Sequence, residues 1–347
     1  MSATDRPLAV LGAGSWGTAL AIQYARAGRP TRLWARDREH VAEMARGRIN
    51  ARYLPDAAFP EALTAVDGLE AALADDADAL VSVPSHALRG MLGQLMALPA
   101  PPGRLCWATK GFEQASGLLP HQVVAEVFGH GTPVAVLSGP TFAKEVAAGL
   151  PTAMVVAGTD SEFATELARS IASDTFRAYL STDIVGVEVG GAVKNALAIG
   201  AGISDGLGYG ANTRIALITR GLSEMVRLGV ALGAEKDTFM GLAGMGDLVL
   251  TCTDDQSRNR RMGLALARGR GQEEALAEIG QVVEGIYAAR AVREVALRHG
   301  VDMPIVEQIY RVIYASAEPR SAVTALMARR LKSESGDWVA YTTEGPD

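Results

Sequence analysis

A lysine within an apolar segment is the first residue of chemical interest. Lys194 lies in EVGGAVKNALAIG (188–200), where its neighbours are mainly glycine, alanine and valine. Lysine occurs only five times among the 33 basic residues, so arginine is the usual cation of this chain. A buried lysine beside another cation loses its proton near neutral pH, which suits general acid–base catalysis. We predict this role for Lys194; the alternative is a lysine that reaches solvent from a half-buried helix.

Four further segments carry polar groups that could bind a ligand or take part in chemistry. Lys110 follows the apolar run LCWA, and the segment SGPTFAKE (138–145) follows VAVL. The segment GMGDLVLTC (244–252) contains Asp247, which we expect to hydrogen-bond Lys194 or a substrate hydroxyl, with Thr251 one helical turn further on. Ser257, Arg258 and Asn259 then combine a hydroxyl, a guanidinium and an amide, a set suited to a phosphate or carboxylate, although SRNRR could also simply begin a basic helix.

A glycine-rich loop near the amino terminus predicts a nucleotide site. Gly12, Gly14 and Gly17 form G-x-G-x-x-G between an apolar run and a helical pattern. Glycines at a strand–helix junction let the backbone approach a pyrophosphate, whose charge faces the helix N-terminus. The alternative is an ordinary turn.

The end of the second predicted strand bears on cofactor choice. It runs into Trp34–Ala35–Arg36–Asp37. An arginine at the ribose position pairs with the 2′-phosphate of NADP, whereas an acidic residue there binds the free ribose hydroxyls of NAD. We predict a preference for NADPH through Arg36, with NAD favoured if Asp37 occupies that position.

The elements that must position these residues are strands and helices in alternation. Apolar runs without alternation are typical of strands covered on both faces, and strand–helix alternation indicates a doubly wound parallel sheet, so the expected class is α/β with a Rossmann domain. The parallel arrangement would bring Lys110 and 138–145 to the edge where ligands bind. The predicted strands are Leu8–Leu11, Thr31–Trp34, Ala79–Val83, Leu105–Ala108, Val134–Leu137, Ala153–Val156 and Phe176–Leu180, with helices over Trp16–Ala27 and Arg38–Ala45.

After about residue 183 the strand patterns fade. Apolar residues recur at helical spacing over Thr213–Leu232, Val283–His299 and Ile305–Ala315. We predict a Rossmann domain at 1–183, an all-helical substrate-binding and catalytic domain at 184–332, a large shared interface with a cleft, and a flexible tail at 333–347.

Composition excludes several classes of protein. The 347 residues are 48% hydrophobic and 21% charged, as in globular proteins with sizeable cores, and the net charge of −6 gives no general attraction for nucleic acid or anionic membranes. Two cysteines, Cys106 and Cys252, are too few for a disulfide scaffold, and the histidines lack metal-ligand spacing, so we expect no metal. No signal peptide and no uninterrupted apolar run of about 18 residues are evident, so we expect a cytoplasmic protein.

These motifs, taken in order, resemble one family. GAGSWGTALA, VPS, ATKG, SGPTFAKE, VGGAVKNALAIG, GMGDL-x-x-T and SRNR cover the chain from about Pro7 to Arg330. The chain closely resembles bacterial NAD(P)-dependent sn-glycerol-3-phosphate dehydrogenase. The resemblance implies reversible reduction of dihydroxyacetone phosphate for phospholipid synthesis, a Rossmann domain and a helical domain of the 6-phosphogluconate-dehydrogenase type.

The resemblance also implies roles for individual residues. Lys194 would be the proton donor and acceptor at the C2 oxygen. Lys110, Gly139, Thr141, Asp247, Ser257, Arg258 and Asn259 would line the substrate. The cofactor would contact the loop glycines and Ser15, Trp16, Arg36, Ala143, Val282 and Glu284, with Lys110 and Arg258 reaching both ligands. The enzyme class suggests a homodimer.

Two other functions compete with this interpretation. A related reductase of 3-hydroxy acids or ketopantoate would carry K-x-x-x-N on its catalytic helix, but Asn195 follows Lys194 directly and position 198 is alanine. A non-catalytic NADPH-binding sensor would need the glycines and Arg36 but not Lys194, Asp247 or residues 257–259. His86, which follows the VPS turn, is a weaker candidate for the acid–base group.

Overall fold

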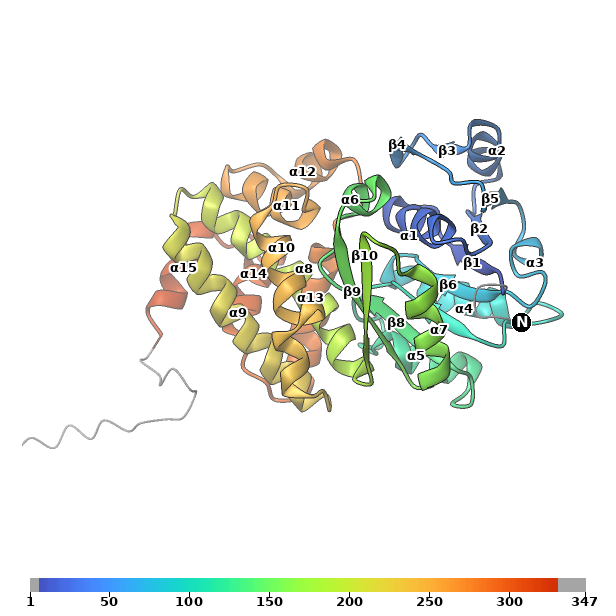
Figure 1. The fold of residues 1–347 in the computed structure, drawn as a ribbon. Helices are drawn as coiled ribbons and strands as arrows, with labels where there is room; N and C mark the ends of the chain where they lie inside the picture. Colours follow the sequence, from blue (N-terminus) through green and yellow to red (C-terminus); the bar gives the residue numbers. More distant parts are fainter. Residues whose placement is uncertain (1–5, 330–347) are drawn as a thin grey trace, which may run out of the picture.

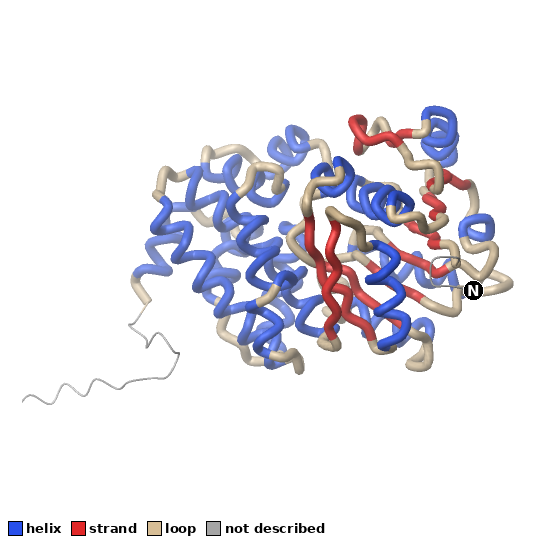
Figure 2. The backbone as a smooth tube through the Cα atoms, in the orientation of Figure 1, coloured by secondary structure: helices blue, strands red, loops and turns tan. Residues whose placement is uncertain are grey.

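The computed structural model describes residues 6–329, which form a sheet-containing part and a helical part (Figure 1). The secondary-structure colouring shows strands confined to one part and a helical array in the other (Figure 2). The predicted tail at 333–347 lies outside the described residues.

An eight-stranded sheet is the core of the first part, in the order β10-β9-β8-β7-β6-β1-β2-β5. Its central strand β1 (Leu8–Leu11) is fully buried and pairs in parallel with β2 and β6, with Leu8 opposite Thr31 and Asp78. The other strands are β2 (Thr31–Trp34), β5 (Leu63–Val66), β6 (Asp78–Val81), β7 (Leu105–Trp107), β8 (Val134–Ser138), β9 (Thr152–Gly158) and β10 (Phe176–Ser181). The predicted Rossmann sheet is confirmed.

One strand pair departs from the predicted parallel pattern. β8 and β9 are antiparallel, with Ser138 opposite Val155. The connection between them is only thirteen residues long and contains the short helix α6 (Ala143–Ala148), so the chain folds back at the carboxyl edge instead of crossing a face. This return keeps SGPTFAKE at the edge where a parallel sheet binds ligands.

Helices cover both faces of the sheet. Leu8 and Val10 of β1 belong to one apolar cluster with α1 and α7, whereas Ala9 and Leu11 belong to another with α4 and α5. This alternation explains why β1 has no polar face. The helices of this part are α1 (Ser15–Arg26), α2 (Arg38–Gly47), α3 (Leu69–Ala72), η1 (Ser85–Ala87), α4 (Leu88–Met96), α5 (Pro120–Phe128) and α7 (Ser161–Ile171), with a hairpin of β3 (Ile49–Asn50) and β4 (Leu54–Ala58).

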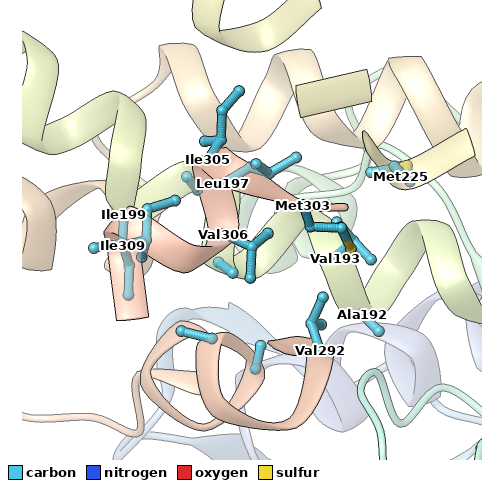
Figure 3. Packing of buried hydrophobic residues seen from close by; sticks show 14 of the residues in the cluster. Ala192, Val193, Leu197, Ile199, Met225, Val292, Met303, Ile305, Val306 and Ile309 are labelled. Carbon is cyan, nitrogen blue, oxygen red and sulfur yellow. The ribbon is translucent and has the colours of Figure 1, made fainter. Parts of the chain in front are cut away.

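The helical part is built around α8 (Ile184–Gly206). Figure 3 shows Val193, Leu197 and Ile199 of this helix among side chains of the surrounding helices. By length and composition α8 could cross a membrane, but 94% of its most apolar window is buried inside the protein. The surrounding elements are α9 (Ala211–Ala231), η2 (Lys236–Met240), η3 (Leu242–Gly246), α10 (Asp247–Thr253), α11 (Arg258–Ala267), α12 (Gln272–Ile279), α13 (Glu284–Arg298), α14 (Pro304–Tyr314) and α15 (Pro319–Met327).

Glycines let α8 and α11 approach closely. A Cβ atom at Gly202 would lie 2.1 Å from the carbonyl oxygen of Arg260, and one at Gly263 would lie 2.0 Å from that of Ile199. The two backbones therefore touch without intervening side chains, which fixes the SRN segment against the helix that carries Lys194.

Candidate active site

The glycine loop forms the turn between β1 and α1 that the sequence predicts. Gly12 has φ +124°, and a Cβ atom there would lie 2.3 Å from the carbonyl oxygen of Ser82. A Cβ atom at Gly17 would lie 1.9 Å from the carbonyl oxygen of Gly12, so both positions require glycine. Gly14 is different, because its Cβ position faces open space.

The N-terminus of α1 fits a dinucleotide. Gly14 is the N-cap residue and has no side chain to accept a hydrogen bond from the first N–H groups of this helix. The buried Nε1 of Trp16 likewise has no hydrogen-bond partner in the described structure. An open approach beside uncapped N–H groups at the positive end of a helix suits a pyrophosphate.

Lys194 lies at the centre of a buried polar cluster. Its side chain is 9% exposed, and its Nζ donates to Asp247 Oδ1 and, at 3.0 Å, to Thr251 Oγ1. Lys110 donates to the other oxygen of Asp247 at 2.7 Å. Asp247 and Thr251 lie one turn apart on α10, and Thr251 also donates to the backbone oxygen of Asp247 at 2.6 Å. The predicted contact between Asp247, Thr251 and Lys194 is present.

Two cations sharing one carboxylate set the charge of the cluster. Burial lowers the pKa of Lys194 to about 8; Asp247 opposes this shift and Lys110 adds to it. Burial would raise the pKa of Asp247, but Lys110 and Lys194 outweigh it and hold that pKa below its usual value. With both lysines charged, the cluster therefore carries one excess positive charge, which Lys194 can release as a proton near neutral pH.

The segment after β8 lies beside this cluster. The carbonyl oxygen of Gly139 accepts hydrogen bonds from Lys110 Nζ at 3.5 Å and from Thr141 Oγ1 at 3.3 Å. Gly139 has φ +151°, and a Cβ atom there would lie 2.9 Å from Cα of Met154. Two of the predicted substrate residues thus adjoin Lys110.

The SRN segment supports the helices around the cluster. Ser257 caps α11 by accepting the N–H of Arg260 at 3.2 Å. Asn259 Nδ2 donates to Asn195 Oδ1 at 2.9 Å, and Asn259 Oδ1 accepts the N–H of Gly285 at 2.9 Å. Asn195 is thereby held next to Lys194. The sequence pattern alone did not assign Asn195 to the site, although its position directly after Lys194 was a signal for it.

Arg258 and Glu284 are partly buried at the beginnings of α11 and α13, and their opposite charges influence each other. Burial lowers the pKa of Arg258. Burial also raises the pKa of Glu284 to about 7, although the charge of Arg258 and a hydrogen bond from Ser85 oppose this rise. The guanidinium also donates to Gln281 at 3.3 Å. Ser85 belongs to η1, so this pair connects the helical part to the VPS turn of the sheet part.

The structure separates the roles open to Arg36 and Asp37. Asp37 caps α2, because its Oδ1 accepts the N–H groups of Glu39 at 3.1 Å and His40 at 3.2 Å. Its Oδ2 pairs with Arg52 at 3.3 Å. Arg36 is exposed, and no ion pair of its side chain occurs in the described part of the chain. The carboxylate is thus engaged by the protein, whereas the guanidinium is available.

The remaining candidates lie at the borders of the site. Ala143 begins α6, and Val282 is 41% exposed just before α13. His86 lies near the Tyr287 ring, with centroids 6.0 Å apart, and has no contact with the lysine cluster in the described structure. Residues 6–329 contain no group of three metal-ligating side chains, and both cysteines are buried and free.

These features together define the class of protein to which the chain belongs. A Rossmann sheet with an open, uncapped helix N-terminus, joined to a helical part that contributes a buried lysine, is the arrangement of a two-part dinucleotide-dependent dehydrogenase.

Comparison with known proteins narrows the class to one family. The family model "NAD-dependent glycerol-3-phosphate dehydrogenase N-terminus" matches residues 7–164, and the corresponding C-terminus model matches 183–324. A glycerol-3-phosphate dehydrogenase [NAD(P)+] of Nitrosococcus oceani is 57% identical over 94% of each chain, and one of Yersinia pestis is 52% identical over 96% of this chain and 99% of its own. The crystal structure of glycerol-3-phosphate dehydrogenase from Coxiella burnetii is 47% identical with a TM-score of 0.91, covering 94% of this chain and all of its own. The chain belongs to the NAD-dependent glycerol-3-phosphate dehydrogenase family, an oxidoreductase family that uses NAD(P).

Proposed function

We propose that this protein reversibly reduces dihydroxyacetone phosphate to sn-glycerol 3-phosphate with NAD(P)H, for glycerophospholipid synthesis. Membership of the family supports the reaction. The observation that carries the mechanism is the buried contact of Lys194 with Asp247 and Thr251.

The reaction needs a proton at the substrate's C2 oxygen. When bound, the dinucleotide supplies the hydride, and the glycine loop with the N-terminus of α1 fits its pyrophosphate. Addition of hydride to the carbonyl carbon leaves negative charge on the C2 oxygen. A lysine ammonium can both stabilise that charge and give up a proton, whereas arginine cannot be deprotonated at working pH.

The partners of Lys194 support both of its protonation states. Asp247 stabilises the ammonium before transfer, and Lys110 favours the neutral amine after it. Thr251 Oγ1, 3.0 Å from Lys194 Nζ, fixes the direction of the amine. In the reverse reaction the neutral amine accepts the proton of the C2 hydroxyl.

We assign the phosphate of the substrate to Arg258. Its guanidinium lies at the beginning of α11, where the positive end of the helix also favours an anion, and Asn259 and Ser257 fix this end of the helix. Lys110, Gly139 and Thr141 would border the rest of the substrate. Lys110 and Arg258 would also reach the cofactor, beside Ser15, Trp16, Ala143, Val282 and Glu284.

We propose NADPH as the preferred cofactor, with NAD also accepted. The support is the exposed guanidinium of Arg36, which has no ion pair among the described residues. The neighbouring carboxylate of Asp37, by contrast, already caps α2 and pairs with Arg52. A 2′-phosphate needs a cation at this place, whereas a free ribose hydroxyl needs an acceptor.

The direct test follows NADPH absorbance with dihydroxyacetone phosphate, ketopantoate and a short 3-oxo acid as substrates. Of these three substrates, we expect only dihydroxyacetone phosphate to be turned over. Turnover only with ketopantoate or the oxo acid would support the related reductases, and tight NADPH binding without turnover of any substrate would support a sensor.

We further propose a cytoplasmic location, a homodimer, and domains at 1–183 and 184–332. Two buried free thiols suit a reducing compartment, and β10 ends at Ser181 while α8 begins at Ile184. The dimer rests on the enzyme class alone. Light scattering should give about twice the chain mass of 36.3 kDa, and a mass equal to one chain would reject the dimer.

A further inference from the structure

A buried carboxylate outside the lysine cluster joins the two parts of the molecule. Glu188, on α8, is 4% exposed. Its Oε1 accepts hydrogen bonds from Trp107 Nε1 and from the backbone N–H of His121, both at 2.9 Å. Its Oε2 lies 2.5 Å from His121 Nδ1. Three polar groups of the sheet part thus converge on one side chain of the helical part.

In each of the two sequence segments that it joins, Glu188 or its partner lies only a few residues from the catalytic cluster. Trp107 ends β7, three residues before Lys110, and Glu188 lies three residues before Gly191 and six before Lys194. A Cβ atom at Gly191 would lie 3.4 Å from Cγ and Cδ of Lys110, so the lysine's aliphatic chain rests on α8. The end of β7 is therefore tied to α8 at Glu188, and Lys110 packs on the same helix one turn further on.

We infer that Glu188 is a positioning residue, which fixes β7 and α5 against α8 so that Lys110 stays beside Asp247 and Lys194. The inference rests on the proposed acid–base role of Lys194. Through this packing Glu188 controls how closely the Lys110 ammonium approaches Lys194, although it touches neither substrate nor cofactor in the proposed site.

The surroundings of Glu188 explain why its loss should matter. A buried carboxylate is costly unless hydrogen bonds and an opposite charge compensate it, and here both come from the other part of the protein. Burial raises the pKa of Glu188, which His121 opposes. Burial lowers the pKa of His121, but Glu188 outweighs it and raises that pKa above its usual value. The charged group facing Glu188 comes from α5, since β7 contributes the neutral indole of Trp107.

The test is Glu188→Ala with the pH dependence of both reaction directions. If Lys110 moves away and water enters, Lys194 loses two influences that lower its pKa. The limb of the pH–rate profile that reflects the titration of Lys194, here called the pH limb, should then move to higher pH by about one unit or more. We expect kcat/KM for dihydroxyacetone phosphate to fall by about tenfold to a hundredfold, as displaced catalytic groups typically cause. Affinity for NADPH should fall by less than kcat/KM does, because Lys110 is the one proposed cofactor contact that this variant displaces.

Glu188→Gln is the conservative variant. Its amide oxygen can still accept from Trp107 and from the His121 N–H, and its NH₂ can donate to a neutral His121 Nδ1. We expect it to restore the pH limb and most of kcat/KM, which a role based on charge alone would not allow.

Glu224→Ala is the matched control. Glu224 is 2% exposed on α9 and accepts the N–H groups of Ile305 at 2.7 Å and Val306 at 3.2 Å, all within the helical part. Its loss should lower stability but leave the pH limb in place. A stability effect is thereby separated from a positioning effect.

Should Glu188→Ala fail to fold, Trp107→Phe removes one hydrogen bond and should move the limb in the same direction by less. The inference is overturned if the pH limb stays in place and kcat/KM remains within about twofold of wild type. Glu188→Ala decides this if it folds, and Trp107→Phe decides it otherwise. Failure of the proposed acid–base role of Lys194 looks different, because Lys194→Ala would then keep wild-type turnover; failure of the proposed reaction would show as absence of turnover with dihydroxyacetone phosphate in the wild type.

Discussion

At the scale of single residues, the account depends on Lys194 being both buried and paired. The sequence could predict its burial from the glycine, alanine and valine around it, but it left open whether Asp247 would bond Lys194 or a substrate hydroxyl. It could not predict that Lys110 shares the same carboxylate, because that contact joins positions 137 residues apart on different parts of the fold. Nor could it show that Asp37 caps α2, since strand ends are uncertain by about two residues from sequence.

The pKa of Lys194 predicts opposite pH dependences for the two directions. Glycerol 3-phosphate oxidation needs the neutral amine, so its rate should rise with pH through about 8. Reduction needs the ammonium and should lose rate over the same range. Lys110→Met removes a cation that lowers this pKa, so both limbs should move to higher pH. Initial rates across pH 6 to 10 provide the measurement, and limbs that stay in place would exclude this influence of Lys110.

Arg258→Ala should weaken recognition of the phosphate. A charge-assisted guanidinium–phosphate contact contributes about 1.5–3 kcal/mol, so KM for dihydroxyacetone phosphate should rise by about tenfold to a hundredfold. Unphosphorylated dihydroxyacetone, a poor substrate throughout, should lose little. Equal losses for both substrates would show that Arg258 does not bind the phosphate.

Arg36→Asp should change the choice of cofactor. The substitution removes a cation and sets a carboxylate against the 2′-phosphate, so preference should shift towards NADH by about a hundredfold, or roughly 3 kcal/mol. Titration of the variant with both cofactors measures the ratio. Similar weakening of both would mean that Arg36 contacts a part they share, such as the adenine.

At the scale of elements, apolar runs located the central strands well because both faces of the sheet are covered. The short strands β3, β4 and β5 were not predicted, since their exposed positions interrupt the apolar pattern. The antiparallel β8–β9 pair was missed for a different reason: strand direction depends on the path of the connection, which composition does not report. Lys194 could be placed on a helix, but the contact of α8 with α11 depends on glycines whose importance appears only in three dimensions.

Gly263→Ala tests that helix contact. The new methyl group would lie 2.0 Å from the carbonyl oxygen of Ile199, so α11 must move away from α8. Overpacking of this kind costs about 1–3 kcal/mol or more of unfolding free energy. Denaturant unfolding measures it, and activity should fall too, because Asn259 and Arg258 move with α11.

Gly93→Ala is the matched control for this substitution. Gly93 lies within α4, where a Cβ atom would meet nothing within 4 Å. The same change should there stabilise the protein by about 0.5–1 kcal/mol. Equal effects at the two positions would show that close packing of α8 and α11 is not what makes Gly263 necessary.

At the scale of the whole molecule, the proposed site needs both parts. Lys110 comes from the sheet part, whereas Lys194 and Asp247 come from the helical part, and Ser85 and Glu284 join the two at a second place. The sequence indicated two parts through the loss of strand patterns near residue 183. It could not show Glu188 and His121 joining them, because a glutamate and a histidine 67 residues apart leave no periodic signal.

The turnover of Lys194→Ala with dihydroxyacetone phosphate and NADPH tests the central claim most directly. The account predicts a loss of at least about a hundredfold in kcat, because the variant lacks both the proton donor and the cation at the C2 oxygen. NADPH affinity, measured by fluorescence titration on the same sample, should match wild type. Turnover within about tenfold of wild type, worth only about 1.4 kcal/mol of barrier, would contradict the assignment of Lys194 as the proton donor.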